Sequence, residues 1–406
     1  MKKILLSAYA CDPSKGSEPG NGWKWAFGIA NRGYEVHVLT NSRGKVEIEK
    51  ILKNIQSDSI KLKFHYVDHS NFWSKAYYWN FVTMYIAYWL WQKKIYNYSK
   101  KEFKTIDFDL VHHVTWGSLK IGSKLYKLGY PMLFGPVGGG QQTPLNYKTY
   151  LGKDYFKEKL RNKFGFLVLK YNPFSKSVLK KCKILVTNKD TQKIVRKLSD
   201  FNPELIFDAA ITNPTSNDFK KTTVSNLNLL WVGRIYGFKG LRLIVHALTM
   251  INKEDLKRIN LTIVGDGPDR INMEKLVDQL KLKDVVKFIG MIPYKEVENY
   301  YQASDIFIYT SLRDSFPSQI LEAQLWKLPV ITLSLHGQEL MVNNKTGIKC
   351  SIGNPEITVK EISNAIVNLL HNPTVRIDMG NEAYNHAITQ TWDKKIDYIV
   401  NEYYPN

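Results

Sequence analysis

Cysteine is scarce in this chain, and its scarcity excludes two classes of small scaffold. Only three cysteines occur in 406 residues, Cys11, Cys182 and Cys350, and they lie far apart. An odd number of scattered cysteines forms neither a disulfide framework nor a zinc cluster. The sequence therefore predicts a reducing, cytoplasmic location and no bound metal.

Long hydrophobic runs are also lacking. The longest aromatic stretch, Phe81 to Trp91, is far shorter than the roughly 20 residues that a membrane-spanning helix needs. The apolar run after Lys2 and Lys3 ends at Asp12, which favours a first buried strand over a signal peptide. The G-x-G-x-x-G fingerprint of dinucleotide sites is absent. We expect no transmembrane helix and no cofactor.

Acidic residues are few in the first half of the chain, and this makes its charge uneven. The net charge is +20, and residues 1–210 hold 35 Lys and Arg against 16 Asp and Glu. Residues 211–406 are almost neutral, with 22 against 21. The excess therefore predicts a basic face on one domain, for which anionic lipid and nucleic acid are the obvious partners.

Trp and Tyr are abundant beside this charge. The stretch from Asn71 to Lys94 is rich in both and closes on a lysine pair, and Leu151 to Lys183 repeats the mixture of lysine with Phe, Leu and Tyr. Such side chains suit a membrane interface, while the alternative for the first stretch is an unusually aromatic core helix. We expect association with the inner face of the membrane.

Short apolar strands alternate with helical stretches along the whole chain. This alternation predicts parallel sheets covered on both faces, in two Rossmann-like α/β domains that face a central cleft. We place the first domain at 1–212, the second at 213–385, and a closing helix that packs back towards the first domain at 386–406. The expected strands are Lys3–Ala8, Glu35–Thr40, Lys61–Val67, Leu110–His113, Met132–Gly135, Ile184–Thr187, Leu229–Val232, Leu261–Val264, Val286–Ile289, Ile306–Tyr309 and Val330–Thr332.

The segment Ser311–Thr332 is the most informative one for function. A buried strand ends at Tyr309, and an apolar-periodic helix follows, with Pro317 at its expected first position. This turn falls at the carboxyl end of a strand, where α/β sheets bind ligands and helix N-termini attract anions. Asp314 and Glu322 thus flank a predicted phosphate site. The alternative is a solvated turn residue and a helix-surface charge.

Glycine turns follow other strands as well. Gly233, Arg234 and Lys239 come directly after the strand that ends at Val232, and two cations beside a glycine turn suit a diphosphate. Gly265 ends the next strand and lets the backbone approach a ligand closely. In the first domain, Gly20 and Gly22 precede an expected helix from Trp23 to Arg32, where their N–H groups could reach a phosphate or sugar.

Taken together, these motifs resemble the family-4 retaining glycosyltransferases of the GT-B fold. The resemblance covers essentially the whole chain and rests on GSEPGNGW, HHVTWGS, GPVGGG, VGRIYGFKG, VGDGP and the segment from Asp314 to Glu322. It implies a nucleotide-sugar donor held mainly by the second domain and an acceptor held by the first. It also implies metal-independent transfer with retention at the anomeric carbon.

By this resemblance, Arg234 and Lys239 neutralise the departing diphosphate, Glu322 holds the ribose hydroxyls and Asp314 contacts the donor sugar. Backbone N–H groups of Phe316, Ser318 and Gln319 meet sugar or phosphate. The chain departs from the family pattern at Asp314, where Glu is usual, and at Pro317, which lacks an N–H. Both departures lie on the sugar side of the expected site.

The acceptor side is less well matched. Many family members carry a His after the strand that corresponds to Met132–Gly135, but this chain has Pro136, Val137 and Gly138 there, followed by Gly139. His113, at the end of the preceding strand, is the nearest substitute, and its alternative is a structural histidine.

The sequence therefore predicts a hexosyl-type retaining glycosyltransferase, with a donor that on family frequency is uridine-linked and an acceptor that is lipid-linked or part of a cell-surface glycan. One rival is a nucleotide-sugar epimerase of the same fold, which needs no acceptor. A rival of another class is a non-catalytic polyanion-binding protein. It leaves the ordered cations and carboxylates of the neutral half unexplained, and no nucleic-acid module is visible.

Overall fold

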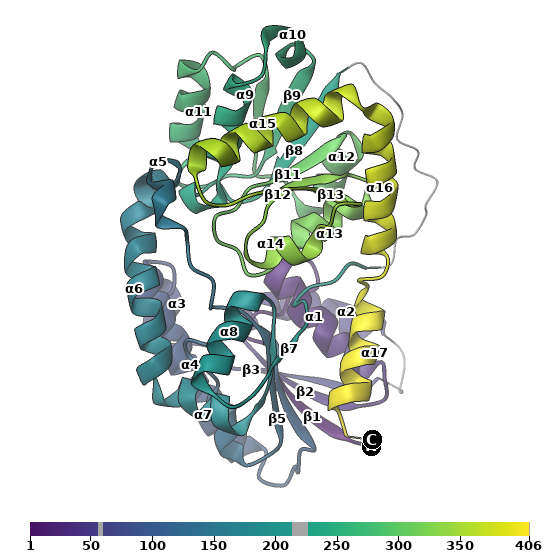
Figure 1. The fold of residues 1–406 in the computed structure, drawn as a ribbon. Coiled ribbons are helices and arrows are strands. Elements are labelled where there is room, and N and C mark those ends of the chain that lie inside the picture. Colours follow the sequence, from purple (N-terminus) through teal and green to yellow (C-terminus); the bar gives the residue numbers. More distant parts are fainter. Residues whose placement is uncertain (56–59, 213–225, 406) are drawn as a thin grey trace. The chain divides into compact units, whose positions relative to one another are not determined.

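The computed structural model describes residues 1–55, 60–212 and 226–405, which form two α/β units (Figure 1). Unit 1 comprises residues 1–140, 164–209 and 392–406, and unit 2 comprises 141–163 and 210–391. Most of the predicted connection around 213–226 lies outside the described residues. Residues 141–163 were counted in the first domain from sequence, but they lie in unit 2 because Tyr147 and Leu151 pack into its core.

Unit 1 is built on a seven-stranded parallel sheet. Its strands pair in the order β3-β2-β1-β4-β5-β6-β7, so the order reverses between β1 and β4, a switch point at which α/β sheets bind ligands. The strands are β1 (Lys3–Ser7), β2 (Glu35–Thr40), β3 (Leu62–Tyr66), β4 (Leu110–His113), β5 (Met132–Val137), β6 (Lys183–Val186) and β7 (Glu204–Leu205). The helices are α1 (Ser17–Ala30), α2 (Lys45–Asn54), α3 (Asn71–Ala76), α4 (Phe81–Glu102), α7 (Pro173–Lys181), α8 (Lys189–Leu198) and α17 (Trp392–Tyr403), with 3-10 turns η1 (Ser42–Gly44) and η2 (Lys124–Leu128).

Unit 2 is built on a six-stranded parallel sheet. Its strands pair in the order β10-β9-β8-β11-β12-β13 and reverse between β8 and β11. The strands are β8 (Leu227–Val232), β9 (Ile259–Val264), β10 (Val286–Gly290), β11 (Ile306–Tyr309), β12 (Val330–Leu333) and β13 (Gly347–Cys350). The helices are α5 (Lys148–Leu151), α9 (Leu241–Thr249), α10 (Lys253–Leu256), α11 (Arg270–Gln279), α12 (Val297–Gln302), α13 (Ser318–Leu325), α14 (His336–Met341), α15 (Pro355–His371) and α16 (Pro373–Ala387), with turns η3 (Leu145–Tyr147), η4 (Gly152–Asp154), η5 (Gly237–Lys239) and η6 (Tyr294–Glu296). Helix α6 (Tyr155–Tyr171) begins in unit 2 and ends in unit 1.

The central strands are apolar because both faces of each sheet are covered. In β8, the consecutive residues Leu229, Leu230 and Trp231 are all fully buried, although their side chains point alternately to opposite faces. The predicted α/β class with two Rossmann-like sheets is thereby confirmed. Two edge strands, β7 and β13, were missed from sequence because the first has only two residues and the second contains Gly347 and Lys349.

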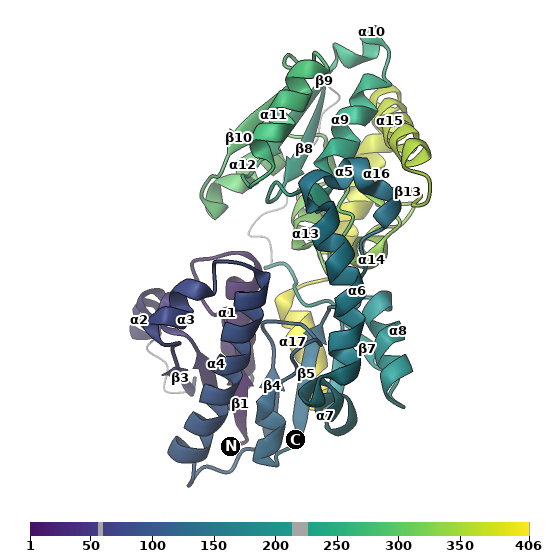
Figure 2. The same ribbon diagram turned by 90° about the vertical axis from the view of Figure 1, so that its left-hand side faces the viewer.

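Helix α17 packs against α1, and both belong to unit 1 (Figures 1 and 2). A Cβ atom at Gly28 would lie 2.0 Å from the end of the Ile396 side chain, so the absence of a side chain there lets the two helices approach closely. Arg32 adds ion pairs to Asp393 at 3.3 Å and Asp397 at 2.8 Å. The two carboxylates are largely exposed, so the apolar contact contributes more to stability.

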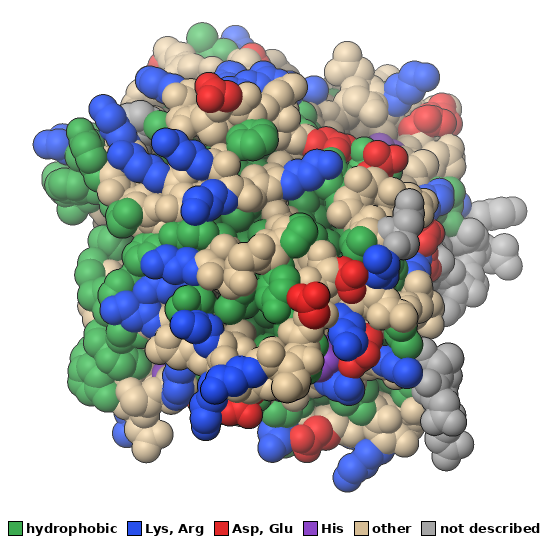
Figure 3. All heavy atoms as spheres, turned by 90° about the horizontal axis from the view of Figure 1, so that it is seen from below, with side chains coloured by type: hydrophobic (Ala, Val, Ile, Leu, Met, Phe, Trp, Pro, Cys, Tyr) green, Lys and Arg blue, Asp and Glu red, His purple; other side chains and the backbone are tan. Residues whose placement is uncertain are grey.

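The aromatic stretch around α3 and α4 is partly core and partly surface. Tyr88 and Trp91 are buried in the core of unit 1, whereas Phe72, Trp79 and Phe81 are exposed. Figure 3 shows hydrophobic side chains interspersed with Lys and Arg on the surface that it views. The core interpretation thus holds for Tyr88 and Trp91, and the membrane interpretation of the exposed rings stays a prediction. Within the described residues, none of the helices combines the length and the apolar character needed to cross a membrane.

Replacing Ile396 with Ala should lower the free energy of unfolding of unit 1 by about 2–4 kcal/mol, the usual cost of such a core truncation. Urea denaturation followed by tryptophan fluorescence measures this loss, since Trp25 and Trp392 lie in contact in the same region. The exposed Asn401→Ala on the same helix is the control and should change little. Equal stability of the two variants would contradict the packing account.

Candidate functional site

Three loops of unit 2 converge at the carboxyl edge of its sheet. They follow β8, β9 and β11, and backbone hydrogen bonds join them, including one of 2.8 Å from Leu312 N to Phe238 O. Gly240 has φ +72°, and a Cβ atom there would lie 1.9 Å from the Thr310 carbonyl oxygen. Gly265 has φ +128°, and its Cβ would lie 1.9 Å from Gly233 O. Glycine is therefore required at both positions for the loops to meet.

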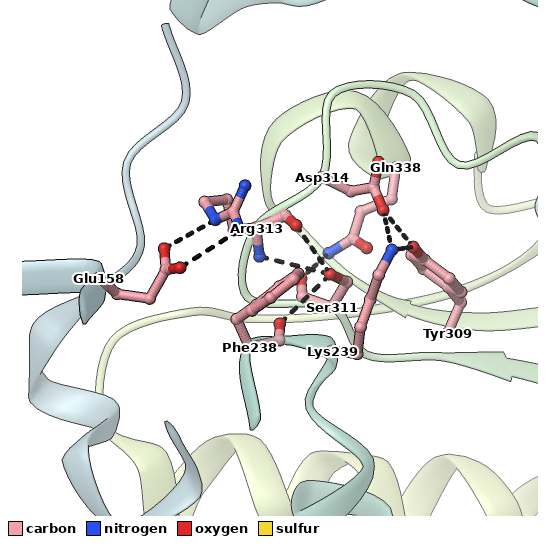
Figure 4. Close-up of polar contacts among 8 residues, drawn as sticks. All are labelled: Glu158, Phe238, Lys239, Tyr309, Ser311, Arg313, Asp314 and Gln338. Carbon is pink, nitrogen blue, oxygen red and sulfur yellow. Dashed lines mark hydrogen bonds and ion pairs between the residues drawn. The ribbon is translucent and has the colours of Figure 1, made fainter. Parts of the chain in front are cut away.

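The loops after β8 and β11 are tied together by one lysine. Lys239 forms an ion pair with Asp314 and donates a hydrogen bond of 2.9 Å to the hydroxyl oxygen of Tyr309 (Figure 4). The Tyr309 hydroxyl in turn donates to Asp314 Oδ2 at 2.5 Å. Lys239 and Asp314 were both predicted as site residues, and the structure brings them together although they are 75 positions apart in the sequence.

Asp314 is held in its charged form by these partners. Burial of the carboxyl acts to raise its pKa, but Lys239 and the Tyr309 hydroxyl outweigh this effect, so the pKa lies below its usual value. The side chain is only 17% exposed. The solvated-turn alternative for Asp314 is therefore not supported.

Glu322 lies on α13, and three hydroxyl groups surround its carboxylate. Tyr301 donates a hydrogen bond of 3.1 Å to Oε2, and Ser318 and Tyr294 approach Oε1 at 3.3 and 3.5 Å. Burial, with the nearby Glu322 charge, raises the pKa of Tyr301 well above its usual value, so that hydroxyl stays a donor. The arrangement fixes the direction in which the carboxylate points.

The helix that carries Glu322 begins one residue later than predicted. Pro317 precedes α13, whose first two residues are Ser318 and Gln319. Both are half-buried, and Phe316 before them is buried. The correction follows from the extended backbone of Pro317, with φ −81° and ψ 94°.

Arg313 and Glu158 are site residues that the sequence analysis missed. Arg313, next to Asp314, pairs with the fully buried Glu158 of α6, with N–O distances of 2.7 and 3.2 Å, and its guanidinium lies 4.1 Å from the centre of the Phe238 ring (Figure 4). Thr143 also donates to Glu158 at 2.6 Å. No local pattern marks Glu158, because its partner is 155 positions away.

Gln338 is a second missed residue beside Asp314 (Figure 4). It is fully enclosed, and its Nε2 donates a hydrogen bond of 2.9 Å to Ser311 O. Its Oε1 has no hydrogen-bond partner within the described chain. A buried amide oxygen in this position has the capacity to accept a hydroxyl from a ligand.

Arg234 lies in the same loop as Lys239 but is exposed. Its guanidinium donates a hydrogen bond of 3.0 Å to the Tyr236 hydroxyl, and among the described residues no ion pair joins it to Asp314 or Glu322. Elsewhere in the described ranges, no cluster of three or more His, Cys, Asp or Glu side chains is arranged to hold a metal ion.

In unit 1, Gly20 and Gly22 are helical and do not form the expected ligand loop. Helix α1 begins at Ser17, six residues before the predicted start. A Cβ atom at Gly20 would lie 2.2 Å from Lys15 O, and one at Gly22 would lie 2.0 Å from Ala10 O. Both glycines therefore allow the loop after β1 to pack against α1, which is a structural role.

Glu18, in the first turn of α1, is the polar side chain that the GSEPGNG motif brings to the switch point. Its carboxylate accepts a hydrogen bond from the backbone N–H of Trp116, in the loop after β4. Trp116 has φ +59°, a strained backbone for a bulky residue, and its ring stacks on Tyr88 at 3.9 Å. The glycines of this motif were predicted as ligand contacts from the sequence, whereas its carboxylate was not.

His113 is a core residue. Its side chain is buried, Nε2 lies 3.3 Å from the Tyr88 hydroxyl, and burial lowers its pKa to about 3. The structural reading of His113 is therefore the one that the structure supports. Gly138 pairs with the loop after β4, donating to Gly117 O at 2.9 Å, and Gly139 beside it has φ +110°.

Removing the Lys239 charge should raise the pKa of the Asp314 carboxyl in Lys239→Met, since burial then acts with its main opposing partner gone. NMR titration of the side-chain carboxyl measures the change, and Lys239→Arg is the control that should keep the pKa low. In the wild type, the lowered pKa stabilises the fold above the ordinary Asp pKa, and this contribution is lost as pH falls through the folded-state value. An unchanged pKa in Lys239→Met would contradict the network.

Sequence comparison finds a family similarity in the second half of the chain. Residues 216–386 match the family model described as "Glycosyl transferases group 1". A similar relative is a D-inositol 3-phosphate glycosyltransferase of Pseudarthrobacter chlorophenolicus, 26% identical over 182 residues, which cover 44% of this chain and 42% of that protein. The chain spans about half the length of the curated relatives that it matches first, 56% and 42%.

Structural comparison extends over the whole chain. Sucrose-phosphate synthase from Thermosynechococcus elongatus matches with a TM-score of 0.73 at 18% identity, covering 99% of this chain and 98% of that one. Anabaena HepE, solved in complex with UDP-glucose, matches with a TM-score of 0.62 at 13% identity, covering 99% and 100%. Residues 216–386 are therefore similar to the glycosyl transferases group 1, and the chain as a whole has the GT-B fold.

Proposed function

We propose that this protein is a retaining, metal-independent hexosyltransferase that moves a sugar from a UDP-sugar donor to a lipid-linked or cell-surface glycan acceptor. The observation that carries the proposal is the Lys239 ammonium, held by Asp314 and Tyr309 at the carboxyl edge of the sheet. This edge belongs to the domain that matches the glycosyltransferase family. A preplaced cation there suits a diphosphate leaving group.

The proposed donor contacts follow from the order of groups along this edge. Lys239 and Arg234, from the loop after β8, would bind the diphosphate, and Glu322, oriented by Tyr301, would accept the ribose hydroxyls. Asp314, with the buried Gln338 beside it, would contact the sugar. The solved complex of HepE with UDP-glucose supports a nucleotide-sugar donor for a chain of this fold.

Transfer breaks the bond between the anomeric carbon and a diphosphate oxygen, and the electron pair stays on the diphosphate. Lys239 and Arg234 would stabilise this charge more in the transition state than in the ground state. The acceptor hydroxyl forms the new bond on the same face of the sugar, and its proton passes to a diphosphate oxygen. Because two cations of the chain itself supply the positive charge, the proposed mechanism uses no metal ion and no side-chain base.

The acceptor would bind at the switch point of unit 1, beside Glu18. Trp116 links this carboxylate to the aromatic surface, because its Nε1 donates a hydrogen bond of 3.0 Å to the Tyr77 hydroxyl at the end of α3. The exposed Trp79 and Phe81 follow directly. Rings that lead from a polar site to an exposed apolar surface suit an acceptor that is anchored in a membrane.

Lys239→Ala should lower kcat at saturating donor by about 100-fold or more, because a single preorganised group at a developing charge typically supplies 10²–10³-fold. Steady-state assays with nucleotide sugars measure this, after thermal-shift screening of nucleoside diphosphates has identified the donor. Lys257→Ala, an exposed lysine before β9, is the control. Full turnover in Lys239→Ala would refute the leaving-group role, and an epimer formed from donor alone would favour the epimerase.

Trp79→Glu combined with Phe81→Glu should weaken flotation with anionic vesicles at low salt, because both exposed rings would enter the interface. Val46→Glu, a still more exposed apolar position on α2, is the control and should float like the wild type. A wild-type protein that does not float would refute membrane docking through this surface.

A further inference from the structure

Helix α6 turns an apolar stripe to solvent. Along its 17 residues, apolar side chains recur at intervals of three or four, so they share one face of the helix. Six of them are 40–70% exposed: Phe156, Leu160, Phe164, Leu167, Val168 and Tyr171. Both ribbon views show α6 on the outside of the elements around it (Figures 1 and 2).

The charges that border this outer face of α6 are positive. Lys157, Lys159, Lys163 and Lys170 are all exposed. The one acidic residue of the helix, Glu158, is fully buried and already paired with Arg313. An apolar stripe edged by lysines matches an anionic lipid surface, because the apolar side chains enter the interface while the ammonium groups remain at the headgroups.

The inner face of the same helix holds the loops of the candidate donor site. Glu158 pairs with Arg313, which precedes Asp314 in the loop after β11. Asp154, at the start of α6, accepts a hydrogen bond of 2.8 Å from Gly237 N in the loop that carries Lys239. A Cβ atom at Gly237 would lie 2.0 Å from the Leu151 carbonyl oxygen. Glycine at this position therefore lets the two segments approach closely. All of these contacts lie within unit 2.

We propose that α6 docks its outer face on an anionic lipid surface and thereby orders the two donor-site loops that Asp154 and Glu158 hold. Docking fixes the position of the helix, and the buried Glu158–Arg313 pair transmits this to the residue next to Asp314. The inference rests on the proposed function, which assigns these two loops to donor binding. It adds a regulatory contact: the two donor-site loops are more rigid on the membrane that holds the acceptor.

The docking contact can be tested with a probe on α6. All three native cysteines are buried, so Leu167→Cys offers a single exposed thiol for an environment-sensitive fluorophore. On phosphatidylglycerol vesicles that contain a lipid-borne quencher, its emission should fall. Ile271→Cys, an exposed apolar position on α11, is the matched control and should stay unquenched. Equal quenching at both positions, or none at 167, would overturn the docking face. A dimer formed through α6 without vesicles would also overturn it.

The coupling can be tested by hydrogen–deuterium exchange of the loops 237–240 and 311–316. Vesicles should slow their exchange by about fivefold or more, the lower range of typical coupling between sites. The surface variant Leu160→Asp with Phe164→Asp should lose this effect. Glu158→Gln and, separately, Arg313→Gln should keep the probe quenched but lose the slowing. Slowing that persists in these variants, or is absent in the wild type, would overturn the coupling.

The proposed function is tested independently by calorimetry with UDP in the absence of vesicles. Absence of UDP binding would refute the proposed function. The probe and the exchange measurements would still decide whether α6 docks and orders the loops.

Discussion

The pairing of Lys239 with Asp314 is the interaction on which the candidate site depends. It joins the loops after β8 and β11, the two strands between which the sheet order reverses. The loops can come this close because Gly240 has no side chain where the Thr310 carbonyl lies. Burying a charged pair at this edge lowers the stability of the fold, since each partner loses hydration. Such a pair is expected where it serves a function. We therefore regard the pair as a preformed place for an anionic ligand.

Much of this arrangement could be predicted from the sequence. The central strands are continuous apolar runs because both sheet faces are covered, so their order along the chain revealed two Rossmann-like sheets. Lys239, Asp314 and Glu322 follow strand ends or a helix start, where position in the sequence implies position at the ligand edge. Where the pattern was read too narrowly, as at Gly20 and Gly22, the helix had already begun.

The rest could not be predicted because it depends on contacts between distant segments. Glu158 resembles any helix-surface carboxylate in sequence, and only the fold shows that it is buried against Arg313. The burial of His113 likewise could not be predicted, because it depends on the contact between β4 and Tyr88. Helix α6 combines both difficulties, since its buried Glu158 and its exposed apolar side chains reverse the usual pattern. That reversal is what connects a surface helix with the donor-side loops.

The central claim is that Lys239 marks the diphosphate end of a nucleotide site and Glu322 its ribose end. Titration calorimetry of UDP and of pyrophosphate into Lys239→Met and Glu322→Gln tests it most directly. The account predicts that Lys239→Met weakens both ligands, whereas Glu322→Gln weakens UDP and leaves pyrophosphate unchanged. Equal binding of UDP to the wild type and both variants would contradict it.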